Sequence, residues 1–179
     1  MVKTAYQNVV IELIRGDIAN QPDCDAVVNA ANAELRIGGG VAGAIHRAAG
    51  PELEKETRPL APIKPGEAVM TGGYNLPNQH IIHCLGPVYG RDKPSDRLLA
   101  DCYKNALRLA EENKLETVGF PAISTGAFGY PMEDAARVAM ASIKEEIPKL
   151  EYVTTIRFVL WGEDAMKIHE KVLSAVFPA

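Results

Sequence analysis

The chain has 179 residues, 47% of them hydrophobic and 23% charged, which excludes a largely disordered or fibrous protein and fits one globular domain over residues 1–179. Its formal net charge of -4 gives no strong nucleic-acid signal, because proteins that bind nucleic acid mainly through phosphates carry a basic surplus. The three cysteines show no CxxC spacing, and no apolar run approaches the ~20 residues that cross a bilayer. We therefore expect a cytoplasmic protein with no membrane segment, no metal site and no cofactor.

Strand-like and helix-like segments alternate along the chain. Runs rich in β-branched and apolar residues predict strands at residues 9–14, 26–28, 68–71, 80–85, 117–120 and 154–161. Helical spacing of apolar residues predicts helices at 41–49, 95–112, 133–147 and 164–176, with Ser95 as an N-cap and Pro148 ending the third helix. This alternation predicts a three-layer α/β/α sandwich with a mixed, mostly parallel sheet.

Three loops follow predicted strands, and ligands in such sheets bind beyond the carboxyl ends of the strands. The loops span residues 16–18, 29–40 and 121–131. The second ends in three glycines before a helix, where backbone N–H groups and the helix N-terminus suit a phosphate. The third, PAISTGAFGYP, offers hydroxyls and small residues. Two such loops at one sheet edge predict a diphosphate held between them.

Better-known nucleotide motifs fit this pattern poorly. Gly38, Gly40 and Gly43 match GxGxxG, but nine residues separate Val28 from Gly38, whereas a dinucleotide fold places its glycines directly after the strand. Neither loop contains the GK[ST] of a P-loop, and no GxSxG surrounds Ser124. A nicotinamide-dependent oxidoreductase therefore stays a weak alternative, and it requires tight binding of NAD(H).

Five segments in this order resemble the macro domain family. They are GDI at residues 16–18, DAVVNAAN at 25–32, GGGVAGAIHRAAG at 38–50, IIHCLGP at 81–87 and FPAISTGAFGYP at 120–131. The sequences of these motifs are most similar to those of the MacroD-type branch, whose members remove ADP-ribose from acidic side chains and deacetylate O-acetyl-ADP-ribose. The resemblance implies the macro domain fold, and it implies ADP-ribose, its derivatives and mono-ADP-ribosylated proteins as partners.

The resemblance also implies a role for individual residues. Asp17 resembles the acid that accepts a hydrogen bond from the adenine amino group, Ile18 lines the same pocket, and Trp161 stands where an aromatic ring often contacts adenine. Two loops would wrap the diphosphate and the distal ribose, with Phe128 against the sugar. The residues of these loops are Gly38, Gly39, Gly40, Val41, Ser124, Thr125, Gly126, Ala127 and Phe128. The polar positions implicated in catalysis are Asn29, Asn32 and His46, and Asn32 is also expected to touch the ligand.

One position departs from the family pattern. Hydrolytic MacroD-type proteins carry an aspartate just after GGGV, where this chain has Ala42. The resemblance implies an ADP-ribosyl ester hydrolase that works by water attack near the distal ribose, and a non-catalytic ADP-ribose reader is the alternative. Structural explanations also stay open: Asp17 as a turn cap, Asn29 as a loop residue bonded to backbone, and His46 or Trp161 as core.

Overall fold

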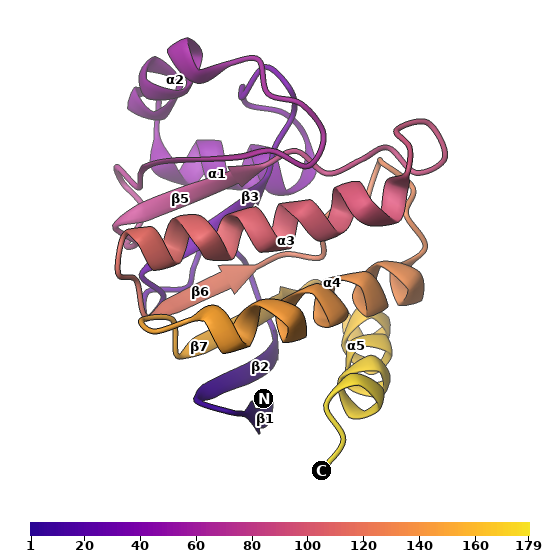
Figure 1. Ribbon diagram of the computed structural model, residues 1–179. Coiled ribbons are helices and arrows are strands. Elements are labelled where there is room, and N and C mark those ends of the chain that lie inside the picture. The colour runs from indigo at the N-terminus through magenta and orange to yellow at the C-terminus, as the bar shows by residue number, and fades with distance from the viewer.

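A seven-stranded sheet forms the centre of the protein in the computed structural model, which describes residues 1–179 (Figure 1). The strands lie in the order β1-β2-β7-β6-β3-β5-β4. Their bounds are Val2–Tyr6 (β1), Val9–Arg15 (β2), Ala26–Ala30 (β3), Ala68–Gly72 (β4), His80–Cys84 (β5), Thr117–Phe120 (β6) and Thr155–Leu160 (β7). The five inner strands are parallel, whereas β1 and β4 pair antiparallel at the edges, which confirms the mixed, mostly parallel sheet.

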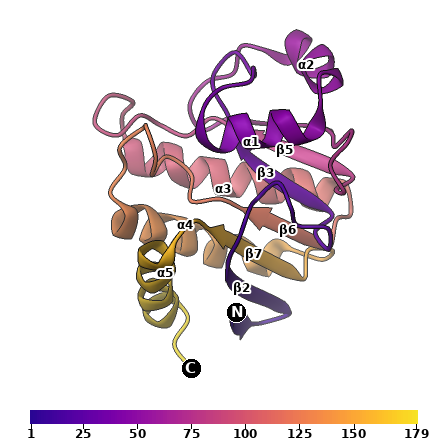
Figure 2. The same ribbon diagram turned by 180° about the vertical axis from the view of Figure 1, so that it is seen from behind.

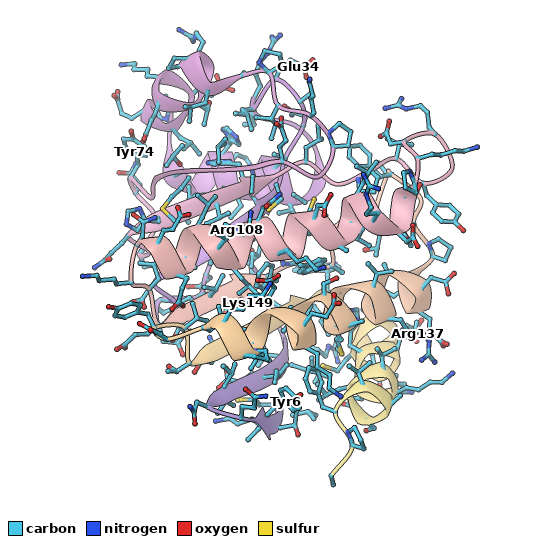
Figure 3. The ribbon with its side chains drawn as sticks, viewed as in Figure 1. Tyr6, Glu34, Tyr74, Arg108, Arg137 and Lys149 are labelled. Atoms are coloured by element: carbon cyan, nitrogen blue, oxygen red, sulfur yellow. The ribbon has the colours of Figure 1, made fainter.

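Five α-helices form the two outer layers. They are α1 (Gly40–Ala49), α2 (Glu52–Thr57), α3 (Ser95–Glu112), α4 (Met132–Glu146) and α5 (Glu163–Val176), with 3-10 turns at Arg58–Leu60 and Ile147–Lys149. Helices α3, α4 and α5 cover one face of the sheet, and α1 with α2 covers the other (Figures 1 and 2). The charged side chains of Arg108, Arg137 and Lys149 are exposed on the first of these layers (Figure 3). The three-layer α/β/α sandwich is confirmed.

The hydrophobic core is divided by the sheet because successive strand residues point to opposite faces. Val28 and Ile82 belong to the large cluster under α3, α4 and α5, while their neighbours Val27 and Ile81 belong to a smaller cluster under α1 and α2. All four side chains are fully buried. The continuous apolar runs at β3 and β5 therefore fill both layers, as central parallel strands do.

Two local predictions need correction. Ser95 does not cap α3, because it is the first helical residue and its Oγ donates to the carbonyl of Asp92 at 2.5 Å. Strand β1 is absent from the prediction, since it is a half-exposed edge strand without a buried apolar run.

Pro148 lies in the 3-10 turn that follows α4, as expected for a residue that stops a helix. No helix is long and apolar enough to span a bilayer.

Candidate functional site

A cleft of about 860 Å³ opens at the carboxyl ends of the parallel strands, between the loops that follow β2, β3, β6 and β7. Every residue predicted to bind the ligand lines it: Asp17, Ile18, Asn32, Gly38, Gly39, Gly40, Val41, Ser124, Thr125, Gly126, Ala127, Phe128 and Trp161. Sequence reasoning missed several other lining residues: Gly16, Ala44, Arg47, Met132 and Ala165. The fold thus collects segments that lie far apart in the sequence into one cavity.

One end of the cleft is formed by the loop after β2. Asp17 Oδ1 accepts a hydrogen bond from the N–H of Ala19 at 2.9 Å, so the turn-capping role holds, yet its other carboxylate oxygen has no protein partner and is exposed. Gln21 fixes this loop, since its Nε2 donates to the Asp17 carbonyl at 2.9 Å and its Oε1 accepts from Arg157 Nη1 at 3.0 Å. Arg157 is itself held by Glu12 at 2.8 Å. A buried ionic network therefore positions Asp17.

Trp161 lies at the same cleft directly after β7. Its side chain is 85% exposed, which excludes the core role and is unusual for the single tryptophan of the chain. An apolar ring that stays in water beside a cleft offers a face for stacking a flat ligand. Ile18, in contrast, is buried and packs in the smaller hydrophobic cluster while one side of it reaches the cleft.

The glycine loop before α1 presents free backbone donors. The N–H groups of Gly39, Gly40 and Val41 donate to no protein acceptor, because they belong to the loop and first turn of a helix. Gly43 is required one turn later, since a Cβ there would collide with the carbonyl of Gly38. A Cβ on Gly39 or Gly40 would meet nothing within 4 Å, so these residues face open space. This is the geometry of an anion site at a helix N-terminus.

The second loop, after β6, faces the first across the cleft. Ser124 adopts a φ of 68°, and its Oγ donates to the carbonyl of Pro87 at 2.8 Å. Its hydroxyl is therefore structural and unavailable as the predicted phosphate donor. The backbone N–H groups of Gly126, Ala127 and Phe128 have no protein acceptor. This loop thus offers N–H groups, with Phe128 half-buried beside them.

Arg47 supplies the cleft with a positive charge that the sequence reasoning did not assign. It lies two turns into α1, is exposed, and forms no ion pair with any acidic side chain. Only its place two turns after Gly40, on the same helix, signals this role in the sequence. An unpaired guanidinium beside free N–H groups strengthens the preference of the cleft for a phosphate.

Asn32 and Ala42 shape the end of the cleft near Gly38. The Asn32 side chain closes its own loop: Oδ1 accepts from the N–H of Arg36 at 2.9 Å, and Nδ2 donates to the Arg36 carbonyl at 2.8 Å. Nδ2 retains a second hydrogen for a ligand. Ala42 is 5% exposed and places only a methyl group at the cleft. Asp17 is consequently the only acidic side chain among the lining residues.

Asn29 and His46 do not line the cleft, although both were predicted to be catalytic. Asn29 is fully buried, and its Nδ2 donates to Nδ1 of His83 at 3.0 Å. Because the amide nitrogen only donates, His83 carries its proton on Nε2, which donates to Thr71 Oγ1 at 2.9 Å. Burial lowers the pKa of His83 to about 3 and also lowers the pKa of His46, so both rings are neutral near pH 7.

Two polar atoms of this buried cluster have no protein partner, namely Asn29 Oδ1 and His46 Nε2. The rings of His46 and His83 lie 6.4 Å apart. The cluster sits behind the cleft wall, where it can fix the backbone of β3 and α1 but does not reach the cavity. A direct catalytic contact for Asn29 or His46 stays a prediction, and the geometry favours a positioning role.

Comparison with known sequences gives one consistent family. The profile of the Macro domain matches residues 28–139. A Macro domain-containing protein of Methanosarcina mazei is 48% identical over 167 residues, covering 93% of this chain and 89% of that protein. The human ADP-ribose glycohydrolase MACROD2 is 45% identical over 170 residues, covering 93% of this chain. This chain spans only 40% of the length of that human protein.

Solved structures agree with these sequence relationships. The macrodomain of Oceanobacillus iheyensis with ADP superposes with a TM-score of 0.93 at 37% identity, covering 98% of this chain and 95% of that one. The Trypanosoma brucei macrodomain in complex with ADP-ribose superposes with a TM-score of 0.85 at 38% identity, covering 91% of this chain and 68% of that one. The shared fold, the family profile and the similarity of nearly the whole chain lead to one conclusion: this protein belongs to the macro domain family and is of the MacroD type.

Proposed function

We propose that this protein binds ADP-ribose in the cleft and hydrolyses ADP-ribosyl esters, either on acidic side chains of proteins or in O-acetyl-ADP-ribose. The observation that carries the proposal is the pair of loops with unpaired backbone N–H groups, one before α1 and one after β6, that face a single cavity. A diphosphate between them would take up these donors. Asp17 and Trp161 at one end suit an adenine, and Asn32 at the other suits a ribose.

The proposed reaction is attack of water near the distal ribose, which releases ADP-ribose and a carboxylic acid. Since Ala42 offers no carboxylate, a phosphate oxygen of the bound substrate and the Nδ2 group of Asn32 would position the water. The free N–H groups of Gly39 and Gly40 would hold that phosphate. This route uses only the Asn32 side chain, backbone N–H groups and a phosphate that the substrate itself supplies.

The reader function is the second candidate, and the observation in its favour is Ala42. A methyl group at the place of the family's usual acid leaves the binding loops intact while it removes the side chain best placed to orient water. In that case the protein would bind mono-ADP-ribosylated proteins and release them unchanged.

Two measurements separate these candidates. Isothermal titration calorimetry with ADP-ribose and AMP tests the cleft: we expect tighter binding of ADP-ribose, because AMP lacks the second phosphate and the distal ribose. Equal affinities would refute the two-loop site. Incubation with a protein mono-ADP-ribosylated on glutamate then tests catalysis, with release of ADP-ribose followed by chromatography. Tight binding of ADP-ribose without release would support the reader function.

A further inference from the structure

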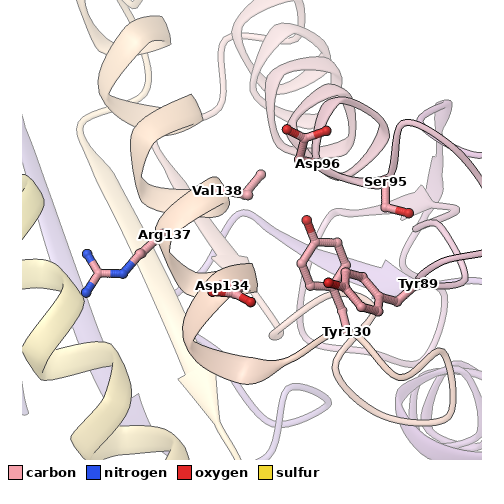
Figure 4. Close-up of a pocket in the computed structure, with 7 residues that line it drawn as sticks. All are labelled: Tyr89, Ser95, Asp96, Tyr130, Asp134, Arg137 and Val138. Carbon is pink, nitrogen blue, oxygen red and sulfur yellow. The ribbon is translucent and has the colours of Figure 1, made fainter.

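A second hollow of about 460 Å³ lies next to the cleft, between the N-terminal turns of α3 and α4 (Figure 4). Tyr89 and Tyr130 form its aromatic wall, with ring centroids 4.7 Å apart and planes inclined at 53°. Asp96 from α3 and Asp134 from α4 place their carboxylates at its rim. The hollow therefore combines aromatic surface with two negative charges contributed by separate helices.

The Tyr130 side chain places its hydroxyl at the surface of the hollow. The residue is only 5% exposed, yet its Oη has no hydrogen-bond partner and points into the hollow, on the side of Asp96 (Figure 4). Burial raises the pKa of Tyr130, and the charges of Asp96, Tyr89 and Asp134 act in the same direction. The phenol is thus neutral near pH 7. The ring is packed in the protein, whereas the Oη atom reaches solvent in the hollow and makes no hydrogen bond to the protein, so the hydroxyl is available to a ligand.

The charges around the hollow favour a cation. Asp134 forms no ion pair or side-chain hydrogen bond, and Asp96 uses one oxygen to accept from the N–H of Arg97 at 2.9 Å. Arg137, the one basic residue that lines the hollow, is engaged by Glu133 at 3.1 Å and extends away from the tyrosines (Figure 4). Both aspartates also lie in first helical turns, where acids complement the helix dipole. That role accounts for the carboxylates but not for the open phenol or the aromatic wall.

The hollow and the cleft share one wall. Tyr130 N–H donates to the carbonyl of Ser124 at 2.9 Å, and Tyr89 N–H donates to the carbonyl of Phe128 at 2.9 Å. The loop after β6 therefore faces the cleft with its N–H groups and the hollow with Tyr130. The loop thus separates the hollow from the cleft, so a polypeptide that left the cleft over this loop would reach the hollow.

We propose that the hollow binds a lysine or arginine side chain of the polypeptide that carries the ADP-ribose. The inference rests on the proposed function, since it places the modified polypeptide outside the cleft. The cation would lie between the carboxylates of Asp96 and Asp134, over the face of Tyr89, and donate a hydrogen bond to Tyr130 Oη. The hollow would thereby select ADP-ribosylation sites that have a basic residue nearby.

The test uses two synthetic peptides that carry ADP-ribose on a central glutamate through a non-hydrolysable linkage. In one, the flanking residues are lysines, and in the other they are glutamines. Fluorescence anisotropy at low salt should give the lysine peptide about tenfold tighter binding, the sum of a few weak charge and cation–π contacts. The double variant Asp96→Asn with Asp134→Asn should bind both peptides equally while its affinity for free ADP-ribose stays unchanged.

Two further variants separate a specific site from a general charge effect. Tyr130→Phe removes only the hydroxyl and should reduce the lysine preference by about threefold, the loss of one hydrogen bond at a partly solvated site. Asp164→Asn removes an exposed acid from the first turn of α5, outside the hollow, and should leave the preference unchanged. A preference that falls equally in Asp164→Asn overturns the proposal in favour of net charge.

The failure of the proposal is distinguishable from failure of the proposed function. If free ADP-ribose binds tightly but wild-type protein does not prefer the lysine peptide, the hollow is not a substrate site and the cleft assignment stands. If free ADP-ribose does not bind, the proposed function fails first, and the proposal fails with it.

Discussion

Replacement of Asp17 by asparagine tests the adenine end of the cleft with little disturbance of the fold. The asparagine side chain would keep an oxygen that accepts from the N–H of Ala19, a contact of 2.9 Å in the wild type. The second oxygen, which has no protein partner, would become an NH2 group. If that oxygen accepts from the adenine amine, the variant loses a hydrogen bond to a charged acceptor, worth about 1.5–3 kcal/mol. The dissociation constant for ADP-ribose should then rise about 10- to 150-fold.

A modified ligand makes this test specific. Inosine-diphosphate ribose carries an oxygen where adenine carries its amine, so the wild-type carboxylate should disfavour it, whereas the NH2 group of the Asp17→Asn variant can donate to it. Calorimetry should therefore show a strong preference for ADP-ribose in the wild type and a lost or reversed preference in the variant. Asp101→Asn, on α3 and outside the cleft, is the control for loss of charge. An unchanged preference would make Asp17 a turn residue only.

Three other perturbations address the phosphate loops, catalysis and the buried histidines. Gly126→Glu should abolish ADP-ribose binding in calorimetry without a lower melting temperature, because a Cβ there meets nothing within 4 Å and the new charge would occupy the phosphate space; retained binding would place the ligand elsewhere. Ala42→Asp should raise kcat about tenfold in a hydrolysis assay, which is less than the ~10²–10⁴-fold rate enhancement of a tuned acid–base group. An unchanged or lower kcat would indicate that the wild-type protein activates the water by another route. His83 has a pKa of about 3 in the folded protein, below its ordinary value, so protonation favours the unfolded chain and stability falls as the pH drops from about 6.5 toward 3, by up to about 1.4 kcal/mol per pH unit. His83→Gln should flatten that decline in denaturant titrations at pH 7 and pH 5, and an equal decline in both proteins would contradict the assignment.

The sheet and the two loops were predictable because their signals are local. Buried runs such as residues 80–85 and 117–120 are apolar whatever they pair with, and the glycines before α1 mark a helix start by themselves. Strand β1 lacks such a signal, since it is stabilised by pairing with β2 and only alternate residues are partly covered. Ser95 shows the same limit. Its hydroxyl can either accept a hydrogen bond as an N-cap or donate one to the carbonyl of Asp92, and the sequence alone does not determine which of the two forms.

The residues that line the cleft were predictable from the sequence, but the hydrogen bonds of their side chains were less so. Ser124 has the residue type of a phosphate donor, but its hydroxyl is taken by Pro87, a residue 37 positions away. The position of Asp17 depends on Gln21 and Arg157, which are 136 residues apart. Contacts of this kind depend on which strands become neighbours, and no local pattern contains that information. Arg47 was overlooked for the same reason, because its exposure in the cleft follows from how α1 lies on the sheet.

The burial of Asn29 and His46 changes what the catalytic step can depend on. No histidine, cysteine or lysine lines the cleft, so no side chain that ordinarily titrates between about pH 6 and 9 is in contact with the cavity. If Asn32, backbone N–H groups and a substrate phosphate position the water, kcat should be flat from about pH 5 to about pH 8 after subtraction of spontaneous hydrolysis. Removal of a proton from the water by His46 as a general base, with its pKa lowered by burial, would instead give a loss of rate on the acid side below about pH 6.5. A pH profile with such an acid limb, absent from His46→Gln, would restore His46 to the reaction and refute the positioning role.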